Sequence, residues 1–303
     1  MDLEMKPTQS FEDRPRSFSL TAAACVFILL LAYVFSCVSG LEGAGPRRPA
    51  SRQIPFQLPI STPEEQGLDA DMLAAAYERA TEIPRIYSML VVRNGRLVAE
   101  EYFDAQTRTT PMPVASVCKS IVGALVGIAL DEGYLVSLDQ RMIDFFPEYD
   151  VPGLDRRKRD ITIRHLLQMR AGFPSDSTIE FFNLLTNSRD WFQLIIVDWP
   201  LERSPGTGWV AESLEDYSAT SWDDYGTYRN IRYGNLWWSA EVDGHEIHFA
   251  RGHGGQFITV VPTLDLVVVT TADNFLGDFT NNSWNTEGAI FRMVARDVIP
   301  AAY

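Results

Sequence analysis

The chain has 303 residues, of which 46% are hydrophobic and 22% charged, with 40 acidic against 26 basic residues. This composition is typical of a globular protein and excludes a mostly disordered chain, a collagen-like repeat and a coiled coil. The formal net charge of −14 repels phosphate backbones, so we expect no nucleic-acid partner. The three cysteines are too few for a disulfide framework or a Cys-rich zinc site.

An apolar stretch without a charged residue runs from Ser17 to Leu41. At 1.5 Å per residue it is long enough to cross a hydrocarbon core of about 30 Å. We therefore predict a tail over 1–16, a cleaved signal peptide or an uncleaved transmembrane anchor over 17–41, and a Pro- and Arg-rich linker over 42–60. The protein is then exported or membrane-anchored, with a single domain over 61–303 on the periplasmic or extracellular side.

The predicted domain starts with a helical pattern over 68–80 and continues with β-rich runs on either side of Asn94-Gly95. Asn-Gly between such runs predicts a hairpin, because both turn residues need a positive φ. Helical patterns dominate the middle part, about 113–207, which begins with an apolar helix over 116–130. A shorter helix over 162–169 has Thr162 as its N-cap.

The C-terminal part is rich in β-branched residues. It predicts strands over 232–239, 246–261 with a glycine break, and 264–271, followed by a closing helix over 289–298. An N-terminal hairpin, a helical middle and C-terminal strands predict an α/β (α+β) fold. Its mostly antiparallel sheet would be completed by both chain ends and flanked by helices, with a helical subdomain beside it.

The strongest candidate for chemistry is the tetrapeptide Ser116-Val117-Cys118-Lys119. On a helix, a serine and a lysine three residues apart lie on one face, so the amine can reach the hydroxyl. An amine whose pKa is lowered by burial can take the proton from the serine and make it a nucleophile. Taken alone the pattern also fits a capped helix start with an exposed lysine, but the apolar helix that follows places Lys119 close to a buried face.

The second candidate is the glycine-rich run Arg251-Gly252-His253-Gly254-Gly255-Gln256 inside the strand-rich part, with His253, Gly254, Gly255 and Gln256 as its site residues. Glycines within a strand pattern mark a close approach of a ligand or another backbone, and such an edge can offer a backbone N–H to an oxyanion. A plain bulge or turn is the other interpretation. The remaining histidines, His165, His245 and His248, have no carboxylate or cysteine set to complete a metal site, so we expect no metal and no cofactor.

Together these motifs resemble the serine β-lactamase-related hydrolases, which include class C β-lactamases, penicillin-binding proteins, esterases and aminohexanoate-oligomer hydrolases. The resemblance covers residues 61 to about 300. Beside the Ser-x-x-Lys helix it rests on the runs GYLVSLDQRMIDFFPEY, ITIRHLLQMRAGF, YGNLWW and RGHGGQFITVVPTLDLVVVTTAD.

The resemblance implies that Ser116 is the acylated nucleophile and Lys119 its base. His253, Gly254 and Gly255 would stand where the family has its Lys/His-Thr/Ser/Gly-Gly strand motif, and the backbone N–H groups of Ser116 and Gln256 would form the oxyanion hole. A histidine in place of the family's lysine favours esters or amides other than β-lactams.

The chain departs from the family at its Tyr-x-Asn motif, which relatives carry shortly after a Pro-Gly. Here Pro205-Gly206-Thr207 is followed at once by Gly208-Trp209, a segment that resembles a much later part of relatives. We interpret this as an internal deletion between Thr207 and Gly208 that removes the motif. Tyr228-Arg229-Asn230 matches the motif in letters but lies in a different place along the chain.

Three hypotheses follow for function. The first is a serine hydrolase that cleaves a small-molecule or short peptide-like ester or amide through an acyl-enzyme on Ser116. The second is a catalytically impaired relative that serves as a binding or scaffold protein, favoured by the missing Tyr region. The third is a D-Ala-D-Ala-type peptidase, which penicillins would label.

Overall fold

The structure, a computed structural model, describes residues 57–174, 187–206, 227–273 and 282–303. The predicted signal peptide or anchor and the predicted deletion point at Thr207 and Gly208 lie outside the described residues, so they stay predictions. No helix in the four described ranges is both long and apolar enough to cross a membrane.

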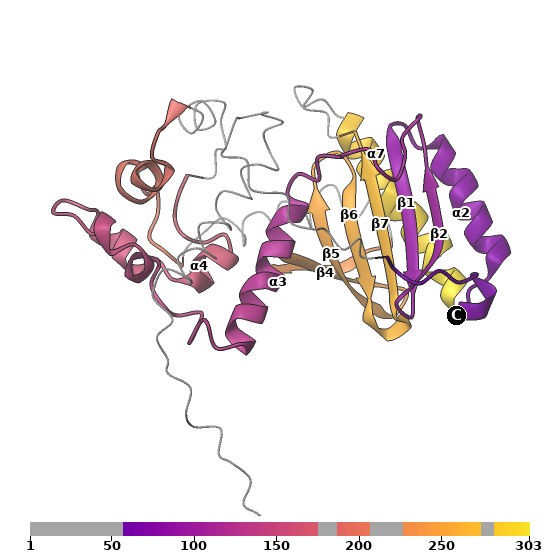
Figure 1. The fold of residues 1–303 in the computed structure, drawn as a ribbon, viewed down its shortest axis with the longest axis horizontal. Helices are drawn as coiled ribbons and strands as arrows, with labels where there is room; N and C mark the ends of the chain where they lie inside the picture. The colour runs from indigo at the N-terminus through magenta and orange to yellow at the C-terminus, as the bar shows by residue number, and fades with distance from the viewer. Residues whose placement is uncertain (1–56, 175–186, 207–226, 274–281) are drawn as a thin grey trace, which may run out of the picture.

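A seven-stranded antiparallel sheet forms one half of the molecule, in the order β2-β1-β7-β6-β5-β4-β3 (Figure 1). The strand β1 pairs with its hairpin partner β2 on one side and with the C-terminal β7 on the other. Both ends of the domain therefore complete the sheet, as the sequence predicts. The strands are β1 (Ile86–Arg93), β2 (Arg96–Tyr102), β3 (Arg229–Gly234), β4 (Trp237–Val242), β5 (His245–Gly252), β6 (Gln256–Val261) and β7 (Leu266–Ala272).

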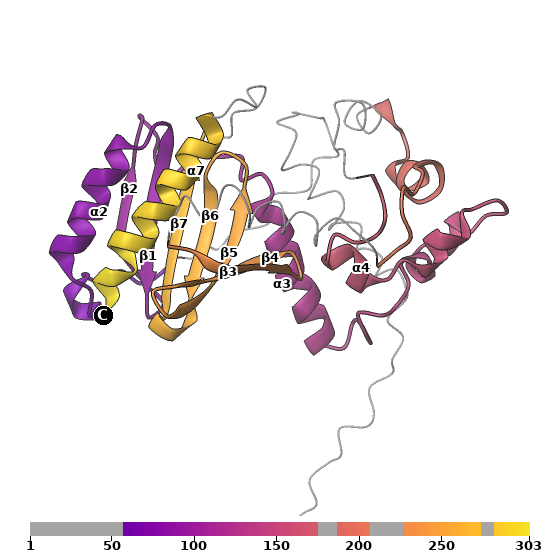
Figure 2. The ribbon, with the colours of Figure 1, turned by 180° about the vertical axis from the view of Figure 1, so that it is seen from behind.

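Helices cover the sheet on both faces (Figures 1 and 2). One face carries α2 (Ala70–Glu82) and α7 (Asn282–Met293), and the other carries α3 (Val117–Asp131). The side chains of β5 alternate accordingly: Phe249 packs on Phe291 of α7, whereas Gly252 lies against the start of α3. The face of the sheet on which a residue at the end of β5 lies therefore follows from its place in this alternation.

The helical half contains mostly short helices. It includes α4 (Ile163–Leu167), the 3-10 turns Met142–Phe145, Pro147–Tyr149 and Arg156–Asp160, and the π-helix Gln193–Asp198. Elsewhere 3-10 turns span Glu64–Gln66, Pro262–Leu264 and Pro300–Ala302, and a π-helix over Val294–Val298 follows α7. The predicted N-cap is confirmed, since Thr162 Oγ1 accepts the N–H of His165 at 3.2 Å.

Two of the predicted strands are wrong in one respect, because each is a hairpin. The run predicted over 232–239 turns at Asn235-Leu236, where φ is 52° and 66°, and the run over 246–261 turns at 253–255. Asparagine adopts positive φ more readily than most residues, whereas leucine does so rarely. Leu236 is held there because its N–H donates to the Leu167 carbonyl at 3.0 Å.

Buried side chains form two clusters. The sheet core lies between the sheet and α2 and α7, and it contains Met89, Phe249, Phe257, Phe291 and Val298 among others. The helical core lies between α3 and the short helices, and it contains Val122, Val126, Ile143, Phe146 and Ile161 among others. The helix α3 thus separates the two cores, with one face on the sheet and one on the helical half.

The junction of α3 with the β3–β4 turn is closely packed. The Ser120 hydroxyl donates to the Leu236 carbonyl at 2.6 Å, and Trp237 Nε1 donates to the Ser120 carbonyl at 2.9 Å. A Cβ placed on Gly123 would lie 2.3 Å from the Asn235 carbonyl oxygen. These contacts hold α3 in a fixed position along the sheet.

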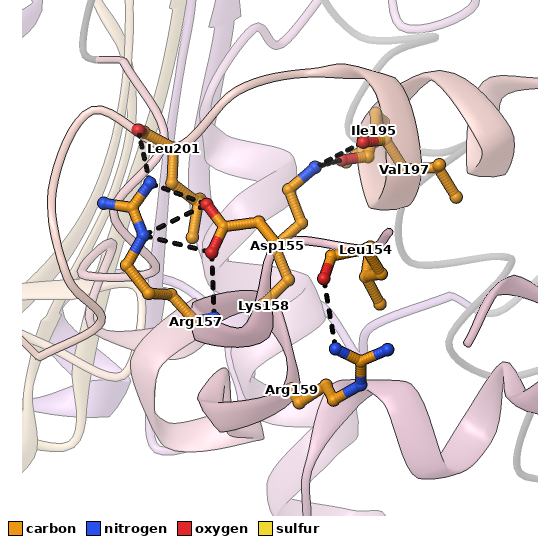
Figure 3. A network of polar contacts seen from close by, with 8 residues as sticks. All are labelled: Leu154, Asp155, Arg157, Lys158, Arg159, Ile195, Val197 and Leu201. Atoms are coloured by element: carbon orange, nitrogen blue, oxygen red, sulfur yellow. Dashed lines mark hydrogen bonds and ion pairs between the residues drawn. The ribbon is translucent and has the colours of Figure 1, made fainter. Parts of the chain in front are cut away.

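A buried lysine stabilises the helical half. Lys158 is 1% exposed, and its ammonium donates to the carbonyls of Val197 at 3.0 Å and Ile195 at 3.5 Å (Figure 3). Burial lowers the pKa of this amine. Beside it, Arg157 binds Asp155 and the Leu201 carbonyl (Figure 3). The 3-10 turn Arg156–Asp160 therefore contacts the distant segment around Ile195, Val197 and Leu201.

Candidate active site

Ser116 is the residue that immediately precedes α3, at the N-terminus of the helix. Its own side chain does not cap the helix, so the hydroxyl is available for other contacts. The preceding residue, Ala115, has a φ of 47°, a left-handed conformation that is uncommon for residues other than glycine. Backbone strain of this kind clusters at functional sites, where surrounding contacts hold it in place.

The Lys119 ammonium lies 2.6 Å from the Ser116 hydroxyl oxygen, as the Ser-x-x-Lys spacing predicts. Burial lowers the pKa of this amine from its ordinary value. A lysine with a lowered pKa spends more of its time as the neutral amine, the form that can accept a proton. The pair therefore has the geometry and the electrostatics of a nucleophile and its base.

The strand that approaches Ser116 is β5, and its last residue, Gly252, makes the closest contact. A Cβ placed on Gly252 would lie 3.2 Å from the Ser116 backbone nitrogen and 2.4 Å from the Val114 carbonyl oxygen. Any side chain at position 252 would therefore lie too close to these backbone atoms. Gly252 was part of the glycine-rich run in the sequence, but its role at the site was missed, because only the strand alternation assigns it to the α3 face.

The residues of the predicted strand motif lie at the turn between β5 and β6, and they do not all lie on the same face of the sheet. His253 is half-buried and follows Gly252 directly, at the start of the turn into β6. Gly254 and Gly255 instead face α7: the Gly254 N–H donates to Glu287 at 2.8 Å, and a Cβ on Gly255 would lie 2.7 Å from Ile290 Cδ1. The reason is that the turn crosses the end of the sheet, so its later residues reach the opposite face.

The Gln256 side chain is directed at β7. Its amide donates to the Ala272 carbonyl at 2.6 Å and accepts the Ala272 N–H at 3.2 Å. In this way the side chain replaces a rung of the backbone ladder at the end of the sheet. Gln256 therefore has a structural task, which the sequence did not indicate.

The cation nearest to the turn in sequence, Arg251, lies on the α7 face. Its Nε and Nη2 bind one carboxylate oxygen of Glu287, at 2.9 and 2.7 Å. The two side chains are 13% and 3% exposed. The guanidinium is therefore committed to an internal ion pair on the far side of the sheet from Ser116.

Two of the other histidines, His165 and His245, make local structural contacts. His165 Nδ1 accepts the Thr162 N–H at 3.2 Å, which closes a capping box on α4. His245 pairs with the Thr263 hydroxyl at 2.7 Å. Within the part of the chain that the structure describes, no three His, Cys, Asp or Glu residues come together as a metal site.

Tyr228, the letter match to the Tyr-x-Asn motif, is in the sheet core. Its ring packs on Phe291 and Phe249, with centroid distances of 4.7 and 6.1 Å. Both contacts lie on the α7 face, so Tyr228 does not lie beside Ser116. The segment 207–226 lies outside the described residues.

The geometry can be compared with known proteins. Residues 74–210 match the family model for Beta-lactamase. A candidate 6-aminohexanoate-dimer hydrolase from Bacillus anthracis is 14% identical, with a TM-score of 0.52, over 81% of this chain and 88% of that one. Residues 74–210 are thus similar to the Beta-lactamase family, and the solved structure shows that the domain shares its fold with the Bacillus anthracis protein.

Two further solved structures are more distant. A penicillin-binding protein from Bacillus halodurans is 14% identical over 71% of this chain and 98% of that one, with a TM-score of 0.46. A β-lactamase from Mycobacterium bovis is 16% identical over 75% and 100%, with a TM-score of 0.40. The comparison with curated proteins gave no match. At 14% identity, the similarity to the Bacillus anthracis structure shows the fold and leaves the substrate open.

Proposed function

We propose that this chain is a serine hydrolase that cleaves an ester or amide through an acyl-enzyme on Ser116. The observation that carries the proposal is the 2.6 Å contact between Ser116 Oγ and Lys119 Nζ at the start of α3. The lowered pKa of Lys119 supports it, because the neutral amine is the form that removes the proton. The family also supports a hydrolase in general terms.

The proposed reaction has two steps. Lys119 accepts the Ser116 proton while Oγ attacks the substrate carbonyl, and the tetrahedral intermediate collapses to an acyl-serine as the leaving group takes up the proton. Water then attacks the acyl-serine, its proton passes to Lys119, and the released serine oxygen is reprotonated. Atoms and charges balance, and no cofactor is needed.

The oxyanion would be held by two backbone N–H groups. One is that of Ser116, at the start of α3. The sequence predicts Gln256 for the other, whereas the approach of Gly252 to Ser116 favours the N–H of His253, the next residue. Removing one oxyanion donor typically costs ~10²–10³ in rate.

The proposed substrate has a neutral acyl group. Arg251 is bound by Glu287 on the opposite face, and so it does not offer its charge to a substrate carboxylate at Ser116. Short uncharged esters and amides are therefore the first substrates to test. We further propose that the apolar segment 17–41 exports or anchors the protein, so that the domain meets these substrates outside the cytoplasm.

The test is covalent labelling of the purified full chain with a fluorophosphonate, read by intact mass, with Ser116→Ala as the control. We expect one adduct on the wild-type chain and none on the variant. A folded wild-type chain without an adduct would contradict the proposal and favour a binding or scaffold protein. Saturable labelling by penicillin would instead favour a peptidase.

A further inference from the structure

The carboxylate of Glu287 is buried at the centre of a small polar cluster on the α7 face. The residue is 2% exposed. One oxygen accepts two hydrogen bonds from Arg251, at 2.9 and 2.7 Å, and the other accepts the Gly254 N–H at 2.8 Å. The carboxylate thus binds residues on both sides of the Gly252-His253 pair.

These contacts hold the turn between β5 and β6 from the α7 side of the sheet. Arg251 precedes Gly252 and Gly254 follows His253, so the contacts of Glu287 span His253 and Gly252, the residue that lies against Ser116. The packing of Gly255 adds to this, because a Cβ there would lie 2.7 Å from Ile290 Cδ1 of α7. The helix α7 therefore determines where the end of β5 lies.

We propose that Glu287 is a positioning residue that holds Gly252 and the His253 N–H against Ser116 for acylation. This inference rests on the proposed hydrolase function. Oxyanion donors stabilise a transition state only where they are already aimed at the developing charge. A buried carboxylate with three donors gives such fixed geometry on the side of the sheet that substrate does not reach.

Stability alone does not explain the buried ion pair between Arg251 and Glu287. Burying two charges costs desolvation energy, and a well-packed apolar pair of similar volume is often as stable or more stable. The bonds to Arg251 and Gly254 therefore favour a role in geometry, which an apolar pair would not fulfil.

The test compares rate constants for fluorophosphonate labelling of the full chain, alongside thermal melting. In the double variant Arg251→Met with Glu287→Met, the buried charges are gone and Gly254 loses its acceptor. We expect a modestly lower melting temperature, because the Gly254 N–H is left buried without a partner, and a labelling rate constant of the folded chain that falls ~10- to 100-fold, in line with a weakened oxyanion donor. The pH midpoint of labelling, set by Lys119, should not move.

A second variant keeps the test valid if the double variant does not fold. Arg251→Lys keeps a charge opposite Glu287 but removes the two-pronged contact, so we expect a smaller fall in the rate constant, about 3- to 10-fold, as an alignment effect. The matched control is Asp297→Asn, which breaks the ion pair with Arg79 at 2.9 Å, away from the turn. It should label at the wild-type rate.

The outcomes separate this inference from the function on which it rests. Wild-type rate constants in folded Glu287 and Arg251 variants would overturn the positioning role and leave the hydrolase intact. A lower final yield of adduct at an unchanged rate constant would also overturn it, because that pattern reports a smaller folded fraction. A wild-type chain that forms no adduct would overturn both.

Discussion

The sheet core and the helical core differ in the elements that build them and in how much apolar surface lies beside them. In the sheet core Phe249 and Val298 are 0% exposed, and strands and long helices account for the burial. On the helical side, α3 leaves Ile121, Leu125 and Ile128 exposed by 39%, 48% and 57%. Ser116 lies at the N-terminus of α3, against the end of β5 on the sheet side and one helical turn before Lys119.

We infer from this difference that the two sides of the site have different roles in the proposed reaction. The sheet side supplies fixed backbone geometry through Gly252 and the turn behind it. The helical side supplies the titrating group, Lys119. Four variants test whether the two sides contribute in these different ways.

The largest effect is expected on the helical side, from Lys119→Met. Loss of the proton acceptor should reduce the acylation rate by ~10²–10⁴. In the wild type, acylation should rise with pH as the amine loses its proton and should level off below the usual lysine pKa, because burial lowers the pKa of Lys119. A pH–rate profile of labelling checks this, and a midpoint at the usual lysine value would contradict it.

On the sheet side, Gly252→Ala should slow acylation by ~10², because the added Cβ forces the strand end away from Ser116 and misplaces it. The predicted contacts are 2.4 Å to the Val114 oxygen and 3.2 Å to the Ser116 nitrogen. Gly234→Ala is the matched control, since a Cβ at the end of β3 meets nothing within 4 Å. Equal labelling rates for both variants would show that the close approach does not matter.

In the helical half, Lys158→Met should destabilise the fold by about 1–3 kcal/mol, because the carbonyls of Ile195 and Val197 lose their buried donor. The pKa of Lys158 is lowered, so the unfolded chain binds this proton more readily than the folded one. Wild-type stability should then rise with pH between the lowered pKa and the ordinary value, and the variant should lose this slope. Urea unfolding at several pH values measures both effects.

The smallest effect is expected in the sheet core, from Tyr228→Phe. Within the described ranges the buried Tyr228 hydroxyl has no hydrogen-bond partner. Its removal should therefore leave stability unchanged or raise it by up to about 1 kcal/mol. Labelling should proceed at the wild-type rate, and a tenfold fall would restore Tyr228 as a candidate for proton transfer.

The sequence predicted the sheet side better than the helical side, for physical reasons. Alternating β-branched residues and Asn94-Gly95 are local signals, and they placed β1, β2, β6 and β7 correctly. The two missed turns depend on tertiary contacts, such as the bond that holds Leu236 at positive φ. Most helical elements here are 3-10 or π turns, which have no strong period in sequence.

The same distinction holds for the candidate site. Ser116 and Lys119 lie on one helix, so their spacing was enough to predict their contact. Gly252 and Glu287 act across long distances in the chain, and no local pattern pairs an arginine in one strand with a glutamate in a later helix. The contacts of Gly254 and Gly255 with α7 depend on the same long-range packing, so no local pattern indicated them.

The position of β1 between β2 and β7 has a consequence for how the protein is made. Contacts between residues so far apart in the chain form slowly, because a long loop must close before they are gained. During synthesis, Ser116 and Lys119 leave the ribosome well before β5, β7 and α7 exist. The nascent chain therefore carries its nucleophile without the strand end that would aim a substrate at it, and the complete site forms only when the last helix docks.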